Sequence, residues 1–323
     1  GHIAWVDGAS GEVLRTIEAP HRLEVLVVSG DASRLAAWQP ETKSIRIIAT
    51  GTGETEFELS APAETAPLAG FNRDGSVLAL VVDQNTIDVF DVPGGTRRSR
   101  IKAEGTYQVG LSPDGATLFV GGHIDERWSW GIRCYESQTG NLIGKSIRGG
   151  AYSPIAISRD GKTLVTRGLQ GIIMVNLATQ EQTKQIPADS QYLFQVACSG
   201  DHLRLASIDS SATLRVDGLD NGTTLRVPCS LRFSQNGSIA VDHSGRRVLA
   251  AGNGEVRMWD LQDRNPRVLL ADSNYVYNTA FSADGRWLAS GGWDGTVRIW
   301  NAESAVCRNT FTITTDVRER FCF

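Results

Sequence analysis

Residues 278–301 read Asn-Thr-Ala-Phe-Ser-Ala-Asp-Gly-Arg-Trp-Leu-Ala-Ser-Gly-Gly-Trp-Asp-Gly-Thr-Val-Arg-Ile-Trp-Asn, and this stretch decides the fold. A short apolar strand leads into a Ser-x-Asp-Gly turn, a Leu-Ala strand follows, and a third apolar strand ends in Trp-Asn. Related copies recur along the chain at intervals of about 40 residues. A repeat of this length with four strands per copy predicts a β-propeller, because a single four-stranded sheet buries its faces only when neighbouring sheets stack against it.

Each repeat carries its own folding signals. The Leu-Ala strands are apolar on both faces, which is expected of strands sandwiched between two neighbouring blades. The turns before them supply the positive φ that tight hairpins require. The clearest of these turns are Asp74-Gly75, Asp114-Gly115, Asp160-Gly161 and Asp284-Gly285.

Alignment on the turn defines the organisation of the chain. Residues 1–17 align with the third and fourth strands of a repeat, with Asp7 at the place of Asn301, and residues 315–323 align with a first strand. We predict a single all-β domain over residues 1–323, a β-propeller of four-stranded antiparallel blades whose seam blade is formed by these two terminal segments. Eight blades are favoured, and seven blades with loose ends are the alternative. The seven full repeats are 23–60, 68–102, 106–148, 152–187, 192–227, 237–271 and 276–313.

The chain resembles the WD-repeat β-propeller family, in particular its bacterial members, and the third strands carry the resemblance, as in Thr86–Asp91, Glu255–Asp260 and Thr296–Asn301. The resemblance covers nearly the whole chain and is strongest in residues 237–301. In the best repeat, Ser290, Asp294 and Trp300 match three members of the hydrogen-bonded tetrad of the family. The fourth member, a His before the first strand, is absent, and Asp272 lies near that place. The loss of this His leaves the implied propeller fold intact, but it implies that the blade of this repeat is less rigid.

Composition excludes several functional classes. The 323 residues carry a formal net charge of −4, and basic residues are scattered except at Arg97, Arg98 and Arg100, so nucleic acid is not a predicted partner. No apolar stretch reaches the roughly 18 residues of a membrane span, and no secretory leader opens the chain, so we predict no membrane association and a cytoplasmic location. The cysteines are odd in number and widely spaced, which favours free thiols over disulfides or a zinc site. They are Cys134, Cys198, Cys229, Cys307 and Cys322.

No catalytic motif has support in the sequence. Asp160-Gly161-Lys162-Thr163 resembles the end of a phosphate-binding loop, but Ala156 stands where that loop needs Gly, and the stretch falls on a repeat turn. The five histidines lie in different repeats without metal-ligand spacing, so they are interpreted as loop residues. We predict no enzymatic activity, no metal and no cofactor for this domain.

The tyrosines are concentrated at one place in the repeat. Five of the six lie five to seven residues before the turn Ser, where the first strand begins at the mouth of the expected central channel: Tyr107, Tyr152, Tyr192, Tyr275 and Tyr277. Tyrosine is enriched at interfaces because it joins a large apolar surface to a hydroxyl group. We predict a tyrosine ring that binds a partner. The alternative is that these rings wedge adjacent blades apart and only stabilise the fold.

The loop 122–130 is longer than its counterparts and contains Trp128 and Trp130, while Trp38 and Trp293 open the equivalent loops of two other repeats. Long loops with aromatic residues on a rigid scaffold are plausible anchors, so Trp38, Trp128 and Trp293 join the predicted partner-binding set. The alternative is that the tryptophans of this loop are strand residues packed on the next blade.

These observations predict a non-catalytic scaffold that recognises a protein or peptide through one face of the propeller. The chain starts without Met and ends within a repeat, so we expect a domain of a larger protein. Bacterial proteins of this resemblance often join such a domain to a catalytic module, which implies a sensor or regulatory role and contacts with other domains of the parent chain. The alternative is a propeller that binds a small molecule or catalyses a reaction at the channel mouth.

Overall fold

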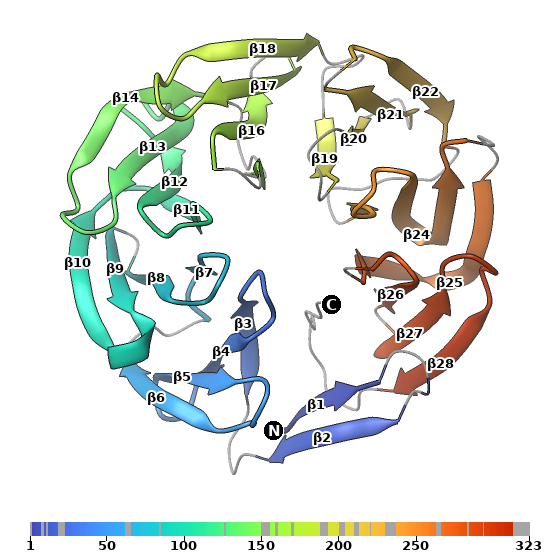
Figure 1. Cartoon of the computed structure of the whole chain (residues 1–323), viewed down its shortest axis with the longest axis horizontal. Coiled ribbons are helices and arrows are strands. Elements are labelled where there is room, and N and C mark those ends of the chain that lie inside the picture. The colour runs from blue at the N-terminus through green and yellow to red at the C-terminus, as the bar shows by residue number, and fades with distance from the viewer. Residues whose placement is uncertain are drawn as a thin grey trace. The chain divides into compact units, whose positions relative to one another are not determined.

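Figure 1 shows the strands of the computed structural model. The chain divides into two compact units, residues 1–5 with 14–186 and residues 6–13 with 187–323. The described residues are 2–7, 10, 12–18, 23–61, 66–83, 85–125, 127–149, 156–158, 161–168, 171–187, 193–199, 204–209, 213–219, 221–229, 237–262, 266–282, 284–292 and 294–312.

The first unit contains four antiparallel four-stranded sheets, blades 1 to 4, whose strands pair in chain order. Blade 1 comprises β3 (Glu24–Val28), β4 (Arg34–Gln39), β5 (Ser44–Ala49) and β6 (Thr55–Ser60). Blade 2 comprises β7 (Ala69–Phe71), β8 (Val77–Asp83), β9 (Thr86–Asp91) and β10 (Thr96–Lys102), with a short 3-10 helix, Val92–Gly94, before β10. Blade 3 comprises β11 (Thr106–Leu111), β12 (Thr117–His123), β13 (Trp130–Glu136) and β14 (Leu142–Arg148). Blade 4 comprises β15 (Ala156–Ile157), β16 (Thr163–Gly168), β17 (Gly171–Asn176) and β18 (Gln182–Pro187).

The second unit contains blades 5 to 7. Blades 6 and 7 share one six-stranded sheet, because two long strands each serve two positions. The strand β24 (Arg247–Asp260) supplies the second and third strands of blade 6, and β25 (Pro266–Phe281) supplies its fourth strand and the first strand of blade 7. Blade 5 comprises β19 (Leu193–Cys198), β20 (Arg204–Asp209), β21 (Thr213–Gly218) and β22 (Thr224–Pro228). The remaining strands are β23 (Ser238–Val241), β24 (Arg247–Asp260), β25 (Pro266–Phe281), β26 (Trp287–Gly292), β27 (Thr296–Asn301) and β28 (Cys307–Thr312).

The described residues thus form seven four-stranded blades, and the favoured eighth blade is not confirmed. The strands β1 (His2–Val6) and β2 (Val13–Glu18) form a two-stranded sheet. Their turn does match the turn between the third and fourth strands of blade 7, because the amides of Ser10 and Ser304 each donate to the side chain three residues earlier, Asp7 and Asn301. Residues 315–323, expected to supply a first strand, lie outside the described residues. Whether the chain is a single domain stays a prediction.

One hydrogen-bond pattern closes the hairpin between the first and second strands in all seven blades. The residue at the start of the turn donates its amide to the carbonyl five positions later at 2.8–3.0 Å, and its side-chain oxygen accepts the amide of that same later residue at 2.8–3.0 Å. A short polar side chain is needed there because only Ser, Asn or Asp reaches its own neighbouring backbone in this way. The seven residues are Ser29, Asn72, Ser112, Ser158, Ser199, Asp242 and Ser282.

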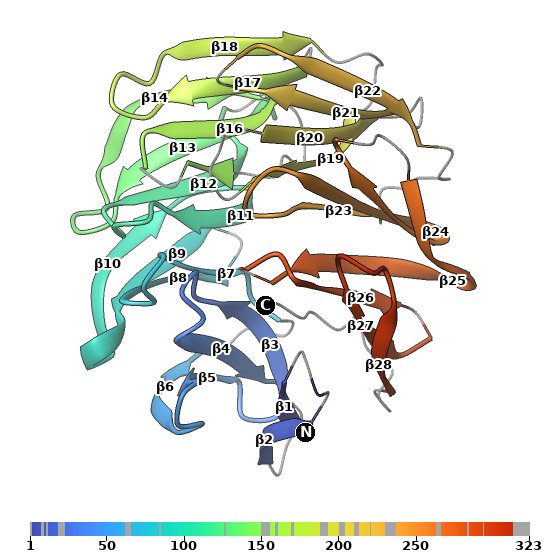
Figure 2. The ribbon, with the colours of Figure 1, turned by 45° about the vertical axis from the view of Figure 1, so that its right-hand side comes forward.

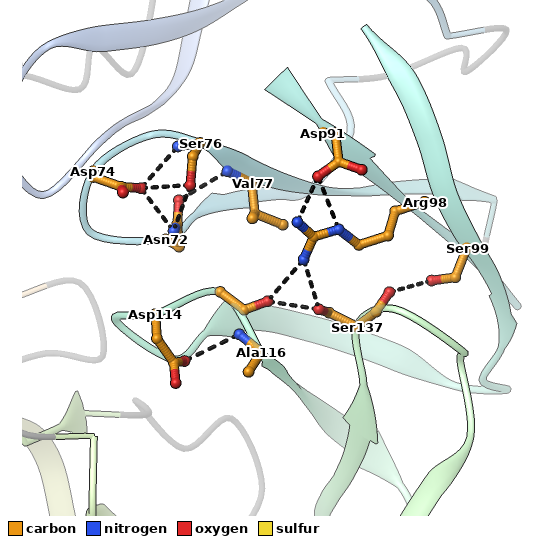
Figure 3. Close-up of polar contacts among 11 residues, drawn as sticks. Asn72, Asp74, Ser76, Val77, Asp91, Arg98, Ser99, Asp114, Ala116 and Ser137 are labelled. Atoms are coloured by element: carbon orange, nitrogen blue, oxygen red, sulfur yellow. Dashed lines mark hydrogen bonds and ion pairs between the residues drawn. The ribbon is translucent and has the colours of Figure 1, made fainter. Parts of the chain in front are cut away.

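An aspartate two positions later completes the turn in several blades. Figure 3 shows Asp74, which accepts the hydroxyl and the amide of Ser76, and Asp114, which accepts the amide of Ala116. In blade 7 the Ser282 hydroxyl and the Arg286 amide donate to Asp284 and lower the pKa of that carboxyl to about 2. These turns are therefore stabilised by ionised carboxylates.

Apolar layers between consecutive blades form the core. Between blades 2 and 3, Val77, Ala79 and Val81 of β8 pack against Leu118 and Val120 of β12. Both views in Figures 1 and 2 show β8 and β12 on neighbouring blades of the first unit. Comparable layers join blades 1 and 2, 3 and 4, 5 and 6, and 6 and 7. The double-sided apolar strands predicted from the sequence thus supply both faces of the layers.

Arginines on outer strands clasp the next blade. In Figure 3, Arg98 of β10 binds Asp91 of its own blade and donates to Ser137 Oγ at 3.1 Å and to the carbonyl of Gly115 at 3.3 Å, both in blade 3. We call such a contact an arginine clasp. Arg15 of β2 makes one to the turn of blade 1, where it donates to the carbonyl of Gly51 at 2.6 Å. Arg267 of β25 makes another to the carbonyl of Glu303 in blade 7.

The predicted tetrad residues of blade 7 form two separate groups. Trp300 Nε1 donates to Ser290 Oγ at 3.0 Å inside the core. The Asp294 carboxylate instead accepts the Thr296 amide and hydroxyl, at 3.0 and 2.7 Å, and a guanidinium N–H of Arg298 at 3.1 Å. The absent His explains the separation, because no imidazole joins the carboxylate to the serine. Only the serine–tryptophan part of the tetrad is therefore present as expected.

Blade 6 offers a natural comparison for this hydrogen bond. Its Trp259 occupies the place of Trp300, but Ala250 stands where blade 7 has Ser290, and the buried Nε1 of Trp259 has no partner in the described structure. We expect Ser290→Ala to lower the free energy of unfolding by about 1–3 kcal/mol, because it leaves the buried indole N–H of Trp300 unsatisfied, as that of Trp259 already is. Ala250→Ser should raise it by about 1 kcal/mol. Urea unfolding measures both changes, and shifts of the same sign in the two variants would contradict this account.

The turn aspartates make stability dependent on pH. A folded-state pKa below that of the unfolded chain stabilises the fold above about pH 4, the ordinary range of the unfolded carboxyl, and this stabilisation is lost as the pH falls towards 2. We expect the unfolding temperature to decrease over that interval. Asp284→Asn keeps an oxygen acceptor without the titration, so it should flatten part of the decrease. Identical pH profiles for the wild type and the variant would show that the Asp284 turn does not contribute.

Candidate functional site

Four rings gather at one end of blade 3, where β11 begins and the loop between β12 and β13 lies. We call Tyr107, His123, Trp128 and Trp130 the blade 3 aromatic cluster. The His123 ring is central: its centroid lies 5.5 Å from that of Tyr107, 4.5 Å from that of Trp128 and 4.3 Å from that of Trp130. Tyr107 and Trp130 are 5.0 Å apart. These are the separations at which aromatic rings attract one another.

A bulge in β11 positions Tyr107. Thr106 pairs with Gly122 and Gln108 pairs with Gly121, so Tyr107 is the extra residue between them. Bulges redirect a side chain relative to the regular alternation of a strand. The backbones also approach closely here, since a Cβ on Gly122 would overlap the carbonyl oxygen of Gly105. The result is a tyrosine at the end of the blade with 45% of its surface exposed.

A hydrogen-bonded loop presents Trp128. The Asp125 carboxylate accepts the amides of Arg127 and Ser129 at 3.1 and 3.0 Å, and the Ser129 carbonyl accepts the Ile124 amide at 2.8 Å. Trp128 adopts φ +59°, a left-handed conformation that costs a residue with a Cβ about 1–2 kcal/mol. Its side chain is nevertheless 70% exposed. The loop thus holds a large apolar group in solvent by means of its backbone bonds.

The charge on Asp125 supports this loop. The Ser129 amide and hydroxyl, the Arg127 amide and the Arg148 guanidinium hold its pKa below the ordinary value, the Ser129 amide being the largest contributor. Arg148 of β14 lies 3.6 Å from the carboxylate. The carboxylate is therefore ionised at neutral pH and accepts its hydrogen bonds as an anion.

The imidazole ring at the centre of the cluster makes no hydrogen bond to the described residues. Both ring nitrogens of His123 are buried, and neither has a hydrogen-bond partner in the described part of the chain. A buried polar atom left without a partner costs about 1–3 kcal/mol. The imidazole is therefore held by packing, to which the surrounding rings contribute, and not by hydrogen bonds of its nitrogens to the described residues.

Several predicted site residues take other positions. Trp38 is in the core of blade 1, only 4% exposed, where it packs with Leu78 and Leu80 of blade 2. This corrects its place in the predicted partner-binding set: it ends an inner strand whose two faces are both covered. Tyr275 and Tyr277 lie in β25, and the structure describes their backbone positions only. Tyr152, Tyr192 and Trp293 lie outside the described residues.

The bulge in β11 belongs to a pattern that was not predicted from the sequence. In β19 the residue between the paired Leu193 and Gln195 is Phe194, and in β25 the residue between Val276 and Asn278 is Tyr277. Both stand five residues before the turn serine, as Tyr107 does. The recurrent feature is therefore an aromatic residue at a first-strand bulge, of which tyrosine is one form. His123 and Trp130 were also missed, although both flank the long loop.

Other site chemistry is not found in the described residues. Their His, Cys, Asp and Glu side chains form no group of three that could hold a metal ion. Burial raises the pKa of Cys134 to about 11 and that of Cys198 to about 12, so neither thiol is an activated nucleophile. In the part of the chain that the structure describes, no helix has the length and apolar character needed to cross a bilayer.

Known proteins resemble parts of this sequence. The family model "WD domain, G-beta repeat" matches residues 265–301. The target of rapamycin complex subunit LST8 of Bos taurus is 33% identical over 85 residues, which are 25% of this chain and 26% of that protein. The WD repeat and SOCS box-containing protein 1 of Takifugu rubripes is 27% identical over 173 residues, which are 50% of this chain and 38% of that protein. The chain thus spans about a quarter to two fifths of the length of these relatives.

The fold has relatives among solved structures. The β-propeller domain of Cps50 (Swd1) from Myceliophteria thermophila superposes with a TM-score of 0.65 at 15% identity, covering 90% of this chain and 99% of that domain. Together with the seven four-stranded blades, this makes the protein a β-propeller. The matching repeat model and the WD-repeat relatives show that residues 265–301 match a WD repeat and that the chain is similar to WD-repeat β-propellers, which typically act as scaffolds for protein interactions.

The loop makes a prediction about Asp125. We expect Asp125→Ala to lower the free energy of unfolding and to speed hydrogen exchange at the Ser129 amide, because two backbone donors lose their acceptor. Near-ultraviolet circular dichroism should change as Trp128 loses its fixed position. Asp83→Ala, which removes the acceptor of the Asn85 amide in the corresponding loop of blade 2, is the matched control. An equal change of the aromatic signal in both variants would contradict the role given to Asp125.

Proposed function

We propose that this propeller recognises a protein or peptide through the blade 3 aromatic cluster and performs no catalysis itself. The observation that carries the proposal is the exposure of Trp128 and Tyr107, 70% and 45%, on backbone that is fixed by a hydrogen-bonded loop and a strand bulge. Large aromatic side chains held in place lose little entropy on binding and dominate the energy of many interfaces.

The position of the cluster supports this function. Loops and strand starts at the end of a blade are where a rigid scaffold carries its binding residues. The other residues predicted from the sequence to bind a partner remain proposals: Tyr152, Tyr192, Tyr275, Tyr277 and Trp293. Trp38 is left out because it is buried.

The wider role is also proposed. We infer a sensor or regulatory domain within a larger cytoplasmic protein, with a protein or peptide ligand and with other domains of its own chain as partners. Neither nucleic acid nor membrane is a proposed partner. The name of LST8 describes a subunit of a target of rapamycin complex, and this supports assembly with proteins as the general mode. Evenly mixed charges, with a net value of −4, give no reason to prefer nucleic acid.

The test is a comparison of exposed residues on blade 3. The wild-type chain is used to recover a partner from the lysate of the parent organism, and calorimetry with the purified partner gives its affinity. Trp128→Ala and Tyr107→Ala should each cost about 1–3 kcal/mol of binding free energy, with little change in unfolding because both side chains are exposed.

Leu142→Ala is the matched control for this experiment. Leu142 is 51% exposed on the same blade, but it follows the turn between β13 and β14 at the opposite end. It should leave the affinity unchanged. Unchanged affinity in the Trp128 and Tyr107 variants, or a lowered unfolding temperature as their only effect, would contradict the proposed binding surface.

A further inference from the structure

We propose that Tyr107, Trp128 and Trp130 form an aromatic cage for a methylated ammonium group, and that His123 fills this cage until the ligand displaces it. The inference rests on the proposed function, which it deepens by naming the chemistry of the recognised group. That group is a quaternary or multiply methylated ammonium, carried by a peptide side chain or by a free small molecule.

The geometry around His123 defines the cage. Three rings from two strands and one loop surround the imidazole, with centroids 5.5, 4.5 and 4.3 Å away. A cation is attracted by an aromatic face when it lies within about 6 Å of the ring centroid. A group placed at the position of the imidazole would therefore lie within reach of all three rings at once.

The missing hydrogen-bond partners of His123 among the described residues determine which type of cation the site favours. The two buried nitrogens of His123 find no hydrogen-bond partner among the described residues, so the space that they occupy offers none to a small polar group. An unmodified ammonium or a guanidinium would bury N–H donors there without acceptors among the described residues, which is unfavourable. A methylated ammonium has few or no donors, and its methyl groups pack on the rings. The site thus favours the methylated cation over lysine or arginine.

The same observation explains how the cage can open. In its buried position the imidazole leaves both nitrogens unsatisfied, and it would regain hydrogen bonds to water on moving out. What holds it is packing, including that of the three rings, and not hydrogen bonds to the described residues. A methylated cation replaces that packing with attraction to the ring faces and has no hydrogen bonds to lose. The exchange therefore needs no rearrangement of the blade, and the loop that carries Trp128 already leaves 70% of its side chain open to solvent.

The experiment uses tetramethylammonium as the probe, with ammonium at the same ionic strength as the comparison. Binding is followed on the whole chain by tryptophan fluorescence and by NMR of the His123 ring. We expect saturable binding of tetramethylammonium and about tenfold weaker or no binding of ammonium. Equal effects of the two cations would overturn the proposal.

Three variants separate the cage from general apolar contact. Trp128→Leu keeps an apolar side chain without a π face and should weaken tetramethylammonium binding about tenfold. His123→Ala removes the group that competes for the cage and should strengthen binding several-fold. Leu142→Ala is the control and should leave it unchanged. Retained affinity in Trp128→Leu, or weakened affinity in a folded His123→Ala protein, would overturn the proposal, and because Trp128 is exposed the first test does not depend on the second variant folding.

The source of the cation is then compared. Choline represents a free small molecule, and a peptide with one trimethyl-lysine, beside the same peptide with unmodified lysine, represents a protein partner. Binding of the trimethylated peptide alone supports both the cage and the proposed function. Binding of choline without the peptide supports the cage and contradicts protein recognition at this site. Binding of neither, or equal binding of both peptides, overturns the cage whatever partner the cluster has.

Discussion

The closure of the first hairpin in each blade is the contact on which the rest of the architecture depends. A single short polar side chain, such as Ser112, fixes the amide and the register of the strand that begins five residues later. Because that strand is apolar on both faces, its register decides which residues enter the layer on each side of the blade. A slip of one residue would exchange the two sets, so this local bond protects packing that involves residues far apart in the sequence.

How much of the structure could be predicted from the sequence depends on whether each feature is caused by residues close together in the chain. The hairpin closures follow from residues that recur at fixed spacing, and the Trp300–Ser290 contact was implied by the resemblance to the WD-repeat family. The burial of Trp38 was not predictable, because a tryptophan that opens a loop and one that ends a buried strand look alike in sequence. The bulge at Tyr107 has no signal in a single repeat, since it depends on the pairing with Gly121 and Gly122. It becomes visible only when the same register shift recurs in β19 and β25.

The blade 3 aromatic cluster combines two kinds of local cost. Trp128 adopts a left-handed backbone conformation, and His123 buries two unsatisfied nitrogens. Such features persist only where the surrounding structure compensates for them, and they are concentrated at functional sites. Here the compensation is visible in the Asp125 carboxylate and in the ring packing. Blade 3 therefore trades some stability for an exposed aromatic surface.

The arginine clasps have a consequence for how the protein comes apart. Arg98 ties the outer strand of one blade to the turn of the next, and Arg15 and Arg267 repeat the arrangement elsewhere. Each clasp joins only sequence neighbours, so the chain behaves as a row of units with nearest-neighbour coupling. Opening one blade then removes support from the blade before it, and fraying should advance along the row in steps of one repeat. A proteolytic cut would enter first at blades whose outer strand has no such arginine.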